Sequence, residues 1–166
     1  MTEFPLLTVA IVTYNRAARL ERTLNDLLAD DYPNREVVVV DGGSTDGTAD
    51  LLASYGQRIR WMSEPDRGEY DAWNKANRMA RGDIVKWLSD DDRLQHGAAR
   101  TAVAYLVEHP DVDMLWGQCA LYEEARDGSR TLTRQTAMMD PARLTLHHFL
   151  RQTHGLPLAV DDLGGS

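Results

Sequence analysis

The chain has 166 residues, of which 43% are hydrophobic and 27% are charged, and its net charge at pH 7 is −8. This length and composition predict a globular domain with a buried core. The negative charge argues against a general nucleic-acid surface, because nucleic acids attract clustered Lys and Arg. No apolar run approaches the roughly 20 residues that cross a bilayer, and the first residues lack a signal-peptide pattern. We therefore expect a cytoplasmic protein without a transmembrane segment, with peripheral membrane association left open.

Apolar runs rich in β-branched residues alternate with segments of helical period along most of the chain. The expected strands are Leu7–Val12, Glu36–Val40, Ile59–Met62, Asp83–Leu88 and a fifth near Met114–Leu121. The expected helices are about Ala17–Leu28, Thr48–Ser54, Tyr70–Ala80 and Ala98–Glu108. This alternation is typical of βαβ units, and four consecutive valines from Val37 predict a strand buried on both faces. The predicted fold is α/β, with a mostly parallel central sheet flanked by helices.

The last third of the chain has weaker patterns. Asp127-Gly128 is a hairpin turn signal between Leu121-Tyr122 and Thr131-Leu132, and Asp140-Pro141 predicts the start of a short helix that ends near Leu150. Residues from Arg151 onward have neither helical period nor alternation. We therefore expect a domain over residues 1–150 and an irregular tail over residues 151–166.

Polar segments follow three of the predicted strands, at the sheet edge where ligands bind in open α/β folds. They are Thr13-Tyr14-Asn15-Arg16, then Asp41-Gly42-Gly43-Ser44-Thr45-Asp46-Gly47-Thr48, and Ser89-Asp90-Asp91-Asp92. Glycines in the second segment allow close approach of the backbone to a ligand, and Asp46 or Thr45 is expected to cap the helix that follows. The acidic triplet predicts a site for Mg²⁺ or Mn²⁺, which take oxygen ligands. Its alternative interpretation is a solvated acidic turn.

Several other active-site motifs are missing from the sequence. The first βα turn has no glycine, so the dinucleotide fingerprint G-x-G-x-x-G is absent, and no G-x-x-x-x-G-K-[ST] loop occurs. There is no G-x-S-x-G elbow, and the histidines do not show H-E-x-x-H spacing. These absences argue against an NAD enzyme, a P-loop NTPase, a serine hydrolase and a zincin.

Four blocks in chain order resemble the family 2 glycosyltransferases of GT-A fold. They are the segments Val9–Arg16, Val39–Thr48 and Ser63–Ala76, followed by Ala80–Ile84 leading to Leu88–Asp92. The resemblance is dense over residues 7–95 and thin beyond Gly117. It implies a GT-A-like domain that transfers a sugar, with inversion, from a nucleotide-diphosphate-sugar donor. The implied acceptor is a glycan, a lipid-linked molecule or another hydroxyl compound, as in polysaccharide biosynthesis.

The resemblance also implies donor-binding residues. Thr13, Asn15 and Asp41 would line the nucleoside pocket with Tyr14 or Arg16 nearby, and Gly42 and Gly43 would shape its wall. Arg67 is the expected cation for the diphosphate, with a solvated loop arginine as the alternative. Asp66, Asp71, Asn74 and Lys75 fall in the block that packs beside the donor, and Asp71 and Asn74 alternatively cap and solvate their helix.

Two departures from the family pattern affect these assignments. The family motif reads D-x-D or D-x-D-D, whereas Ser89 takes the place of its first acid if Leu88 and Leu94 fix the register. Asp91 and Asp92 are then the ribose and metal contacts, and the alternative register pairs Asp90 with Asp92. Gly42 stands where many members carry another acid, which leaves the donor base open.

No catalytic base is evident in the sequence. In the resembled family, a carboxylate well downstream of the acidic motif takes the proton of the acceptor, and the late acids here are Asp161 and Asp162. Their alternative interpretation is a polar terminus. We therefore expect a truncated glycosyltransferase. A non-catalytic nucleotide-sugar-binding module is a second hypothesis. A sugar-nucleotide nucleotidyltransferase is a third, although the Gly-rich loop and lysine expected after its first strand are absent.

Overall fold

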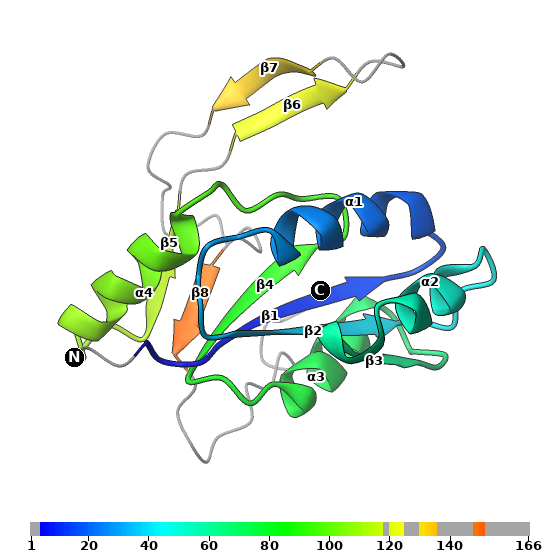
Figure 1. Ribbon diagram of the computed structural model, residues 1–166, viewed down its shortest axis with the longest axis horizontal. Helices are drawn as coiled ribbons and strands as arrows, with labels where there is room; N and C mark the ends of the chain where they lie inside the picture. The colour runs from blue at the N-terminus through cyan, green and yellow to red at the C-terminus, as the bar shows by residue number, and fades with distance from the viewer. Residues whose placement is uncertain (1–3, 118–119, 125–129, 136–147, 152–166) are drawn as a thin grey trace, which may run out of the picture.

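Four parallel strands form the main part of a six-stranded sheet (Figure 1). The structure is a computed structural model, and it describes residues 4–117, 120–124, 130–135 and 148–151. The strand order is β3-β2-β1-β4-β8-β5. The parallel strands are β1 (Leu7–Thr13), β2 (Arg35–Asp41), β3 (Arg60–Ser63) and β4 (Ile84–Ser89). Each lies within one residue of its predicted bounds, so the expected α/β fold with a mostly parallel sheet is confirmed.

The connecting helices also follow the predicted bounds to within one residue. They are α1 (Ala17–Leu28), α2 (Thr48–Ser54), α3 (Glu69–Met79) and α4 (Ala98–Glu108), with a short 3₁₀ turn, η1 (Gly56–Arg58), before β3. Among the helices that the structure describes, none has the length and apolar character needed to cross a membrane.

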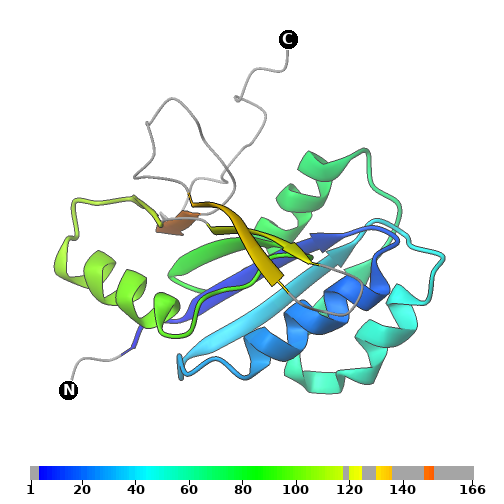
Figure 2. The ribbon, with the colours of Figure 1, turned by 90° about the horizontal axis from the view of Figure 1, so that it is seen from above.

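The sheet is covered on both faces. Apolar residues of α1, α2 and α4 pack with Leu7, Val9 and Ile11 of β1 in one core cluster. Ala72, Trp73 and Ala76 of α3 pack with residues of the opposite face, among them Ala10 and Trp87. Figure 2 shows α3 on one side of the sheet and α1 and α2 on the other. Because both faces are covered, the Val37–Val40 run is buried, as its continuous apolar sequence predicts.

Two predictions for the last third of the chain are wrong. The fifth strand does not run unbroken to Leu121: β5 (Met114–Trp116) ends before Gly117, and β6 (Ala120–Glu124) pairs instead with β7 (Arg130–Gln135). The expected helix does not reach Leu150, because His148–Arg151 forms strand β8, antiparallel to both β4 and β5. A strand at this position supplies hydrogen bonds to backbone groups of β4 that would otherwise be unpaired. This gain in pairing outweighs the local preference of the segment for a helix.

Other predictions for this region lie partly beyond the described part of the chain. The antiparallel pairing of β6 with β7 agrees with the expected hairpin, whereas its Asp127-Gly128 turn lies outside the described residues. The expected helix start at Asp140-Pro141 also lies outside them. Arg151 pairs with Ile84, so one residue assigned to the tail belongs to the sheet, and residues 152–166 are not described.

Candidate functional site

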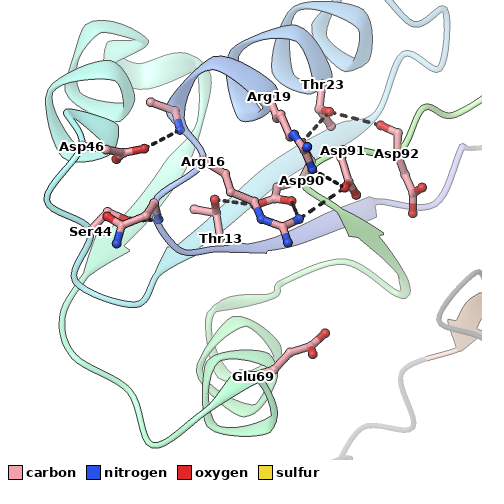
Figure 3. Close-up of polar contacts among 12 residues, drawn as sticks. Thr13, Arg16, Arg19, Thr23, Ser44, Asp46, Glu69, Asp90, Asp91 and Asp92 are labelled. Atoms are coloured by element: carbon pink, nitrogen blue, oxygen red, sulfur yellow. Dashed lines mark hydrogen bonds and ion pairs between the residues drawn. The ribbon is translucent and has the colours of Figure 1, made fainter. Parts of the chain in front are cut away.

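The segments that follow β1, β2 and β4 meet at one edge of the sheet. Thr13 is in register with Asp41 on β2, and Val12 is in register with Ser89 on β4. Because these strands are parallel neighbours, the loops at their carboxyl ends are adjacent. Figure 3 shows side chains of these loops directed toward one another. The site is therefore built from the polar segments that the sequence analysis identified.

Asp90 connects the acidic triplet to the first loop. It is only 4% exposed, and it accepts hydrogen bonds from the Thr13 hydroxyl (2.7 Å) and from Arg16 Nη1 (3.1 Å). Burial raises the pKa of Asp90 above 3.8, while the Thr13 hydrogen bond and the Arg16 charge oppose the rise. Asp90 is thus an internal anchor of the site, and its contact with a donor stays a prediction.

Asp91 lies at the surface between two arginines of the first loop and helix. Its Oδ2 is 3.3 Å from Nη1 of Arg16 and 3.3 Å from Nη1 of Arg19 (Figure 3). Sequence reasoning did not identify Arg19, although its place three residues after Arg16 puts both cations on one face of α1. The two cations offset part of the negative charge of the acidic triplet.

Asp92 has a different orientation from its neighbours. Figure 3 shows its carboxylate pointing away from Asp90 and Asp91. The buried Thr23 hydroxyl donates to the backbone carbonyls of Asp90 (2.9 Å) and Asp92 (3.2 Å), and it thereby fixes the turn that carries the acids. An oxygen ligand at the carboxyl end of a sheet fits a hard divalent cation. The carboxylates of Asp91 and Asp92 do not converge in this structure, and a cation shared by these two residues stays a prediction.

Asp41 holds the glycine-rich loop from inside the protein. The residue is fully buried, and its carboxylate accepts hydrogen bonds from the Ser44 backbone N–H (3.0 Å), the Ser44 hydroxyl and the Ser63 hydroxyl (2.6 Å). These internal donors satisfy both of its oxygens. The geometry gives Asp41 a structural role that sequence reasoning missed, and its contact with a nucleoside stays a prediction.

Asn15 and Asp46 join the first loop to the glycine-rich loop. Asn15 has a positive φ of 53°; its backbone N–H donates to Ser44 Oγ (2.7 Å), and its side-chain oxygen accepts from the backbone N–H of Thr45 (2.8 Å). Asp46 accepts from the backbone N–H of Ala17 (2.9 Å) and from that of Thr48 (3.1 Å). Asp46 therefore caps α2 as predicted, and it also caps α1.

An open depression of about 450 Å³ lies at the start of α1. Polar side chains on its wall include Asn15, Arg16, Arg19 and Asp46. It borders the acidic turn through Arg16 and Arg19, both of which contact Asp91. Tyr14, which precedes the lining residues, is 59% exposed.

Only some residues of the Ser63–Ala76 block lie at this site. The side chain of Arg67 is 90% exposed, and its Nη2 lies 3.7 Å from Oδ1 of Asp71, a contact that agrees with the solvated alternative. Asp71 accepts from the Arg67 backbone N–H (3.1 Å), and this bond is the main cause of its lowered pKa. Lys75 donates to the Pro65 carbonyl (3.0 Å) and pairs with Glu64. Asn74 is half-buried on α3, and the donor contacts of Arg67 and Asn74 stay predictions.

The glycine pair after Asp41 packs against the loop that contains Asp66. A Cβ atom placed on Gly42 would lie 2.5 Å from Oδ2 of Asp66, and one on Gly43 would lie 3.1 Å from the backbone nitrogen of Pro65. Gly43 also has φ +84°, whereas Gly42 does not have a positive φ. The resemblance placed Asp66 in the block beside the donor, and the structure adds that its carboxylate lies over Gly42.

A second acidic group lies at the other end of the sheet. Asp30, Asp31 and His96 bring potential ligand atoms within 4.8 Å of one another. Asp30 and Asp31 precede the amino end of β2, opposite the carboxyl-end loops. The Asp31 carboxylate also accepts a hydrogen bond from Arg100 Nε (3.4 Å), so this residue helps to hold α4 against the segment before β2. The candidate bases Asp161 and Asp162 lie outside the described residues.

Known proteins share this sequence pattern and fold. The model of the family "Glycosyl transferase family 2" matches residues 8–159. An uncharacterised glycosyltransferase of Mycobacterium tuberculosis is 35% identical over 120 residues, which are 70% of this chain and 46% of the relative. A glycosyltransferase of PGL/p-HBAD biosynthesis from Mycobacterium bovis is 33% identical over 118 residues, or 68% of this chain and 46% of the relative. The chain thus spans less than half the length of these relatives.

Solved structures agree with this result. The mannosyltransferase PcManGT from Pyrobaculum calidifontis, in complex with GDP-Man and Mn²⁺, is 33% identical with a TM-score of 0.64, over 69% of this chain and 36% of that chain. S. aureus TarS 1-349, in complex with UDP-GlcNAc, is 29% identical with a TM-score of 0.60, over 66% and 33% of the two chains. Sequence, fold and the order of the motif blocks agree: this chain belongs to glycosyl transferase family 2.

Proposed function

We propose that this chain forms the donor-binding part of an inverting, metal-assisted glycosyltransferase that uses a nucleotide-diphosphate sugar. The observation that carries the proposal is the joining of the first loop to the acidic turn, through the bonds of Thr13 and Arg16 to Asp90. A site that combines carboxylates, arginines and an open depression fits a metal-bound diphosphate. The GDP-Man and UDP-GlcNAc complexes of the two structural neighbours support this choice of ligand.

Charge supports the participation of a divalent cation. The chain has a net charge of −8, and a nucleoside diphosphate is itself strongly anionic. Asp92 would hold Mg²⁺ or Mn²⁺, with Asp91 as the second ligand once its carboxylate turns from Arg16 and Arg19, and would thereby place a cation against the diphosphate. When bound, such a cation offsets the negative charge that builds on the leaving group. Arg16 and Arg19 lie close enough to Asp91 to exchange this carboxylate for a phosphate oxygen of the donor.

The remaining chemistry concerns the acceptor. In an inverting transfer, the acceptor oxygen forms a bond to the anomeric carbon while the bond to the nucleoside diphosphate breaks. A carboxylate then takes the proton of the acceptor hydroxyl. Asp161 and Asp162 are the proposed candidates for this base, and a glycan or lipid-linked molecule is the proposed acceptor. If these acids do not serve, the chain binds the donor without transferring the sugar.

Calorimetric titration tests the donor site. UDP, GDP and their sugars are titrated into the wild-type chain with and without Mn²⁺, and the titrations are repeated with Asp92→Asn and Asp31→Asn. We expect metal-dependent binding that Asp92→Asn weakens at least tenfold, because the substitution removes a charged metal ligand. Asp31→Asn, which alters the second acidic group, should retain wild-type affinity. The absence of nucleotide binding under all conditions would refute the proposal.

A transfer assay separates an enzyme from a binding module. The chain is incubated with a labelled UDP- or GDP-sugar and hydroxyl acceptors, and the labelled product is compared for the wild type and for Asp161→Asn and Asp162→Asn. Transfer that is lost in one of these variants assigns the base. Metal-dependent donor binding without transfer by any of the chains indicates that the base lies outside this sequence.

A further inference from the structure

Gly42 lacks a side chain for a spatial reason. Its φ is not positive, so its backbone conformation does not require glycine. A Cβ atom at this position would lie 2.5 Å from Oδ2 and 3.3 Å from Cγ of Asp66. These separations are too short for an unshifted side chain. Gly42 therefore leaves the space that the carboxylate of Asp66 occupies.

Asp66 is held over Gly42 by bonds on both sides of it in the chain. Its Oδ1 accepts a hydrogen bond from the Gly68 backbone N–H (2.9 Å). Lys75, whose side chain is 11% exposed, binds the Pro65 carbonyl and Glu64, each at 3.0 Å. In the part of the chain that the structure describes, Oδ2 of Asp66 accepts no hydrogen bond. This carboxylate is thus fixed in place and keeps one acceptor oxygen for a ligand.

An aromatic ring borders the same space. Cδ2 of Tyr14 would lie 3.4 Å from a Cβ on Gly42, and Tyr14 is 59% exposed. Exposed aromatic rings stack on nucleobases, and a carboxylate accepts hydrogen bonds from ring N–H and amino groups. Asp41, by contrast, is fully buried and bonded to Ser44 and Ser63. The exposed Tyr14 ring and the half-buried Asp66 carboxylate beside Gly42 suit a planar heterocycle that presents N–H donors.

We propose that Asp66 reads the base of the nucleotide donor and selects uracil or guanine; this inference rests on the proposed function. Uracil presents its N3–H, and guanine presents its N1–H together with its amino group. Adenine and cytosine present an unprotonated ring nitrogen at the corresponding position, and this nitrogen repels a carboxylate, which can only accept hydrogen bonds. Many members of the family carry an acid at the position of Gly42. In this proposal Asp66, on the loop before α3, takes the place of that acid.

The test compares base preference across matched variants. UDP, GDP, ADP and CDP are titrated calorimetrically, in the presence of Mn²⁺, into wild type, Asp66→Asn, Asp66→Ala, Gly42→Ala and Asp111→Asn. Wild type should prefer UDP or GDP to ADP and CDP. Both Asp66 variants should bind the preferred nucleotide roughly tenfold or more weakly and lose much of the preference. Gly42→Ala should have a similar effect, because its Cβ displaces the carboxylate.

Asp111→Asn removes the same charge at an exposed position between α4 and β5, which does not border the Gly42 space. Its affinity and base preference should match those of wild type, and circular dichroism confirms that each variant is folded. Wild-type affinity and preference in both Asp66 variants would overturn this inference alone. The absence of binding by wild type to any of the nucleotides would instead overturn the proposed function, and this inference with it.

Discussion

Asp46 shows how one exposed carboxylate organises two helices. The hydroxyl of Thr48 and then the backbone N–H of Ala17 lower the pKa of Asp46 below 3.8. Both groups donate to the charged form, and they satisfy amides at the first turns of α1 and α2. The sequence predicted the cap on α2, since Asp46 lies two residues before Thr48. The cap on α1 connects distant parts of the chain and has no local signal.

The lowered pKa makes a pH-dependent prediction for Asp46→Asn. A carboxylate with a depressed pKa in the folded state stabilises the fold above its unfolded pKa, and this contribution is lost as pH falls through the folded pKa. We therefore expect the variant to have a lower urea midpoint than wild type at pH 7. The difference should shrink as pH falls below about 3.8. Urea unfolding followed by circular dichroism from pH 7 to pH 2.5 measures it.

Asp111→Asn is the control for this experiment, since Asp111 is exposed beyond the end of α4. Its midpoint should follow that of wild type at each pH. A difference between Asp46→Asn and wild type that stays constant across the pH range would contradict the proposed role of the Asp46 charge.

At the scale of elements, the four parallel strands were predictable, while the antiparallel strand β8 was not. The buried valines of β2 identify a central strand from composition alone. Strand β8 has no such run, and its pairing with β4 and β5 depends on residues far away in the sequence. Local patterns do not encode this pairing, because the stability of a short strand comes from the strands on either side of it.

Gly82 determines how closely β4 approaches β1. A Cβ atom there would lie 2.6 Å from the Leu6 carbonyl oxygen and 2.6 Å from the Thr8 nitrogen. The Gly82 backbone N–H also donates to the Thr8 hydroxyl (2.9 Å). Because backbone atoms of a central strand cannot shift cheaply, Gly82→Ala should lower the free energy of unfolding by about 1–3 kcal/mol. Urea denaturation gives this value.

Gly117→Ala is the matched control, since a Cβ on Gly117 meets no atom of the described residues within 4 Å. We expect a change in the free energy of unfolding of less than about 0.5 kcal/mol for this variant. Equal stability of Gly82→Ala and Gly117→Ala would show that β4 does not pack against β1 as closely as described.

The whole molecule presents its polar loops at one edge of a sheet that is covered on both faces. This arrangement leaves the carboxyl-end loops available to a ligand while the core stays closed. The hydrogen bonds of Asp46 and Asn15 connect the loop after β1 to the loop after β2. The hydrogen bonds of Asp90 connect the loop after β4 to the loop after β1. A ligand that contacts all three loops should therefore stabilise the entire fold.

Thermal unfolding tests this coupling. At a concentration of 100 times its dissociation constant, a ligand that binds only the folded state contributes about 2.7 kcal/mol. For a chain of this size, we expect UDP or GDP with Mn²⁺ to raise the Tm by roughly 5–10 °C. In Asp92→Asn, or with EDTA in place of Mn²⁺, the rise should be much smaller. An equal rise in wild type and Asp92→Asn would place the metal elsewhere.

The sequence by itself determined the order and bounds of the first four strands and the connecting helices, and it identified the loops that meet at the sheet edge. Local periodicity and the geometry of parallel strands are sufficient for these conclusions. The tertiary structure decided which carboxylates are buried and which border open space at the sheet edge: Asp41 and Asp90 are buried, whereas Asp66 lies over Gly42. The physical reason is that residue type defines what a carboxylate can bind, while its hydrogen-bond donors come from strands and loops that only folding brings together.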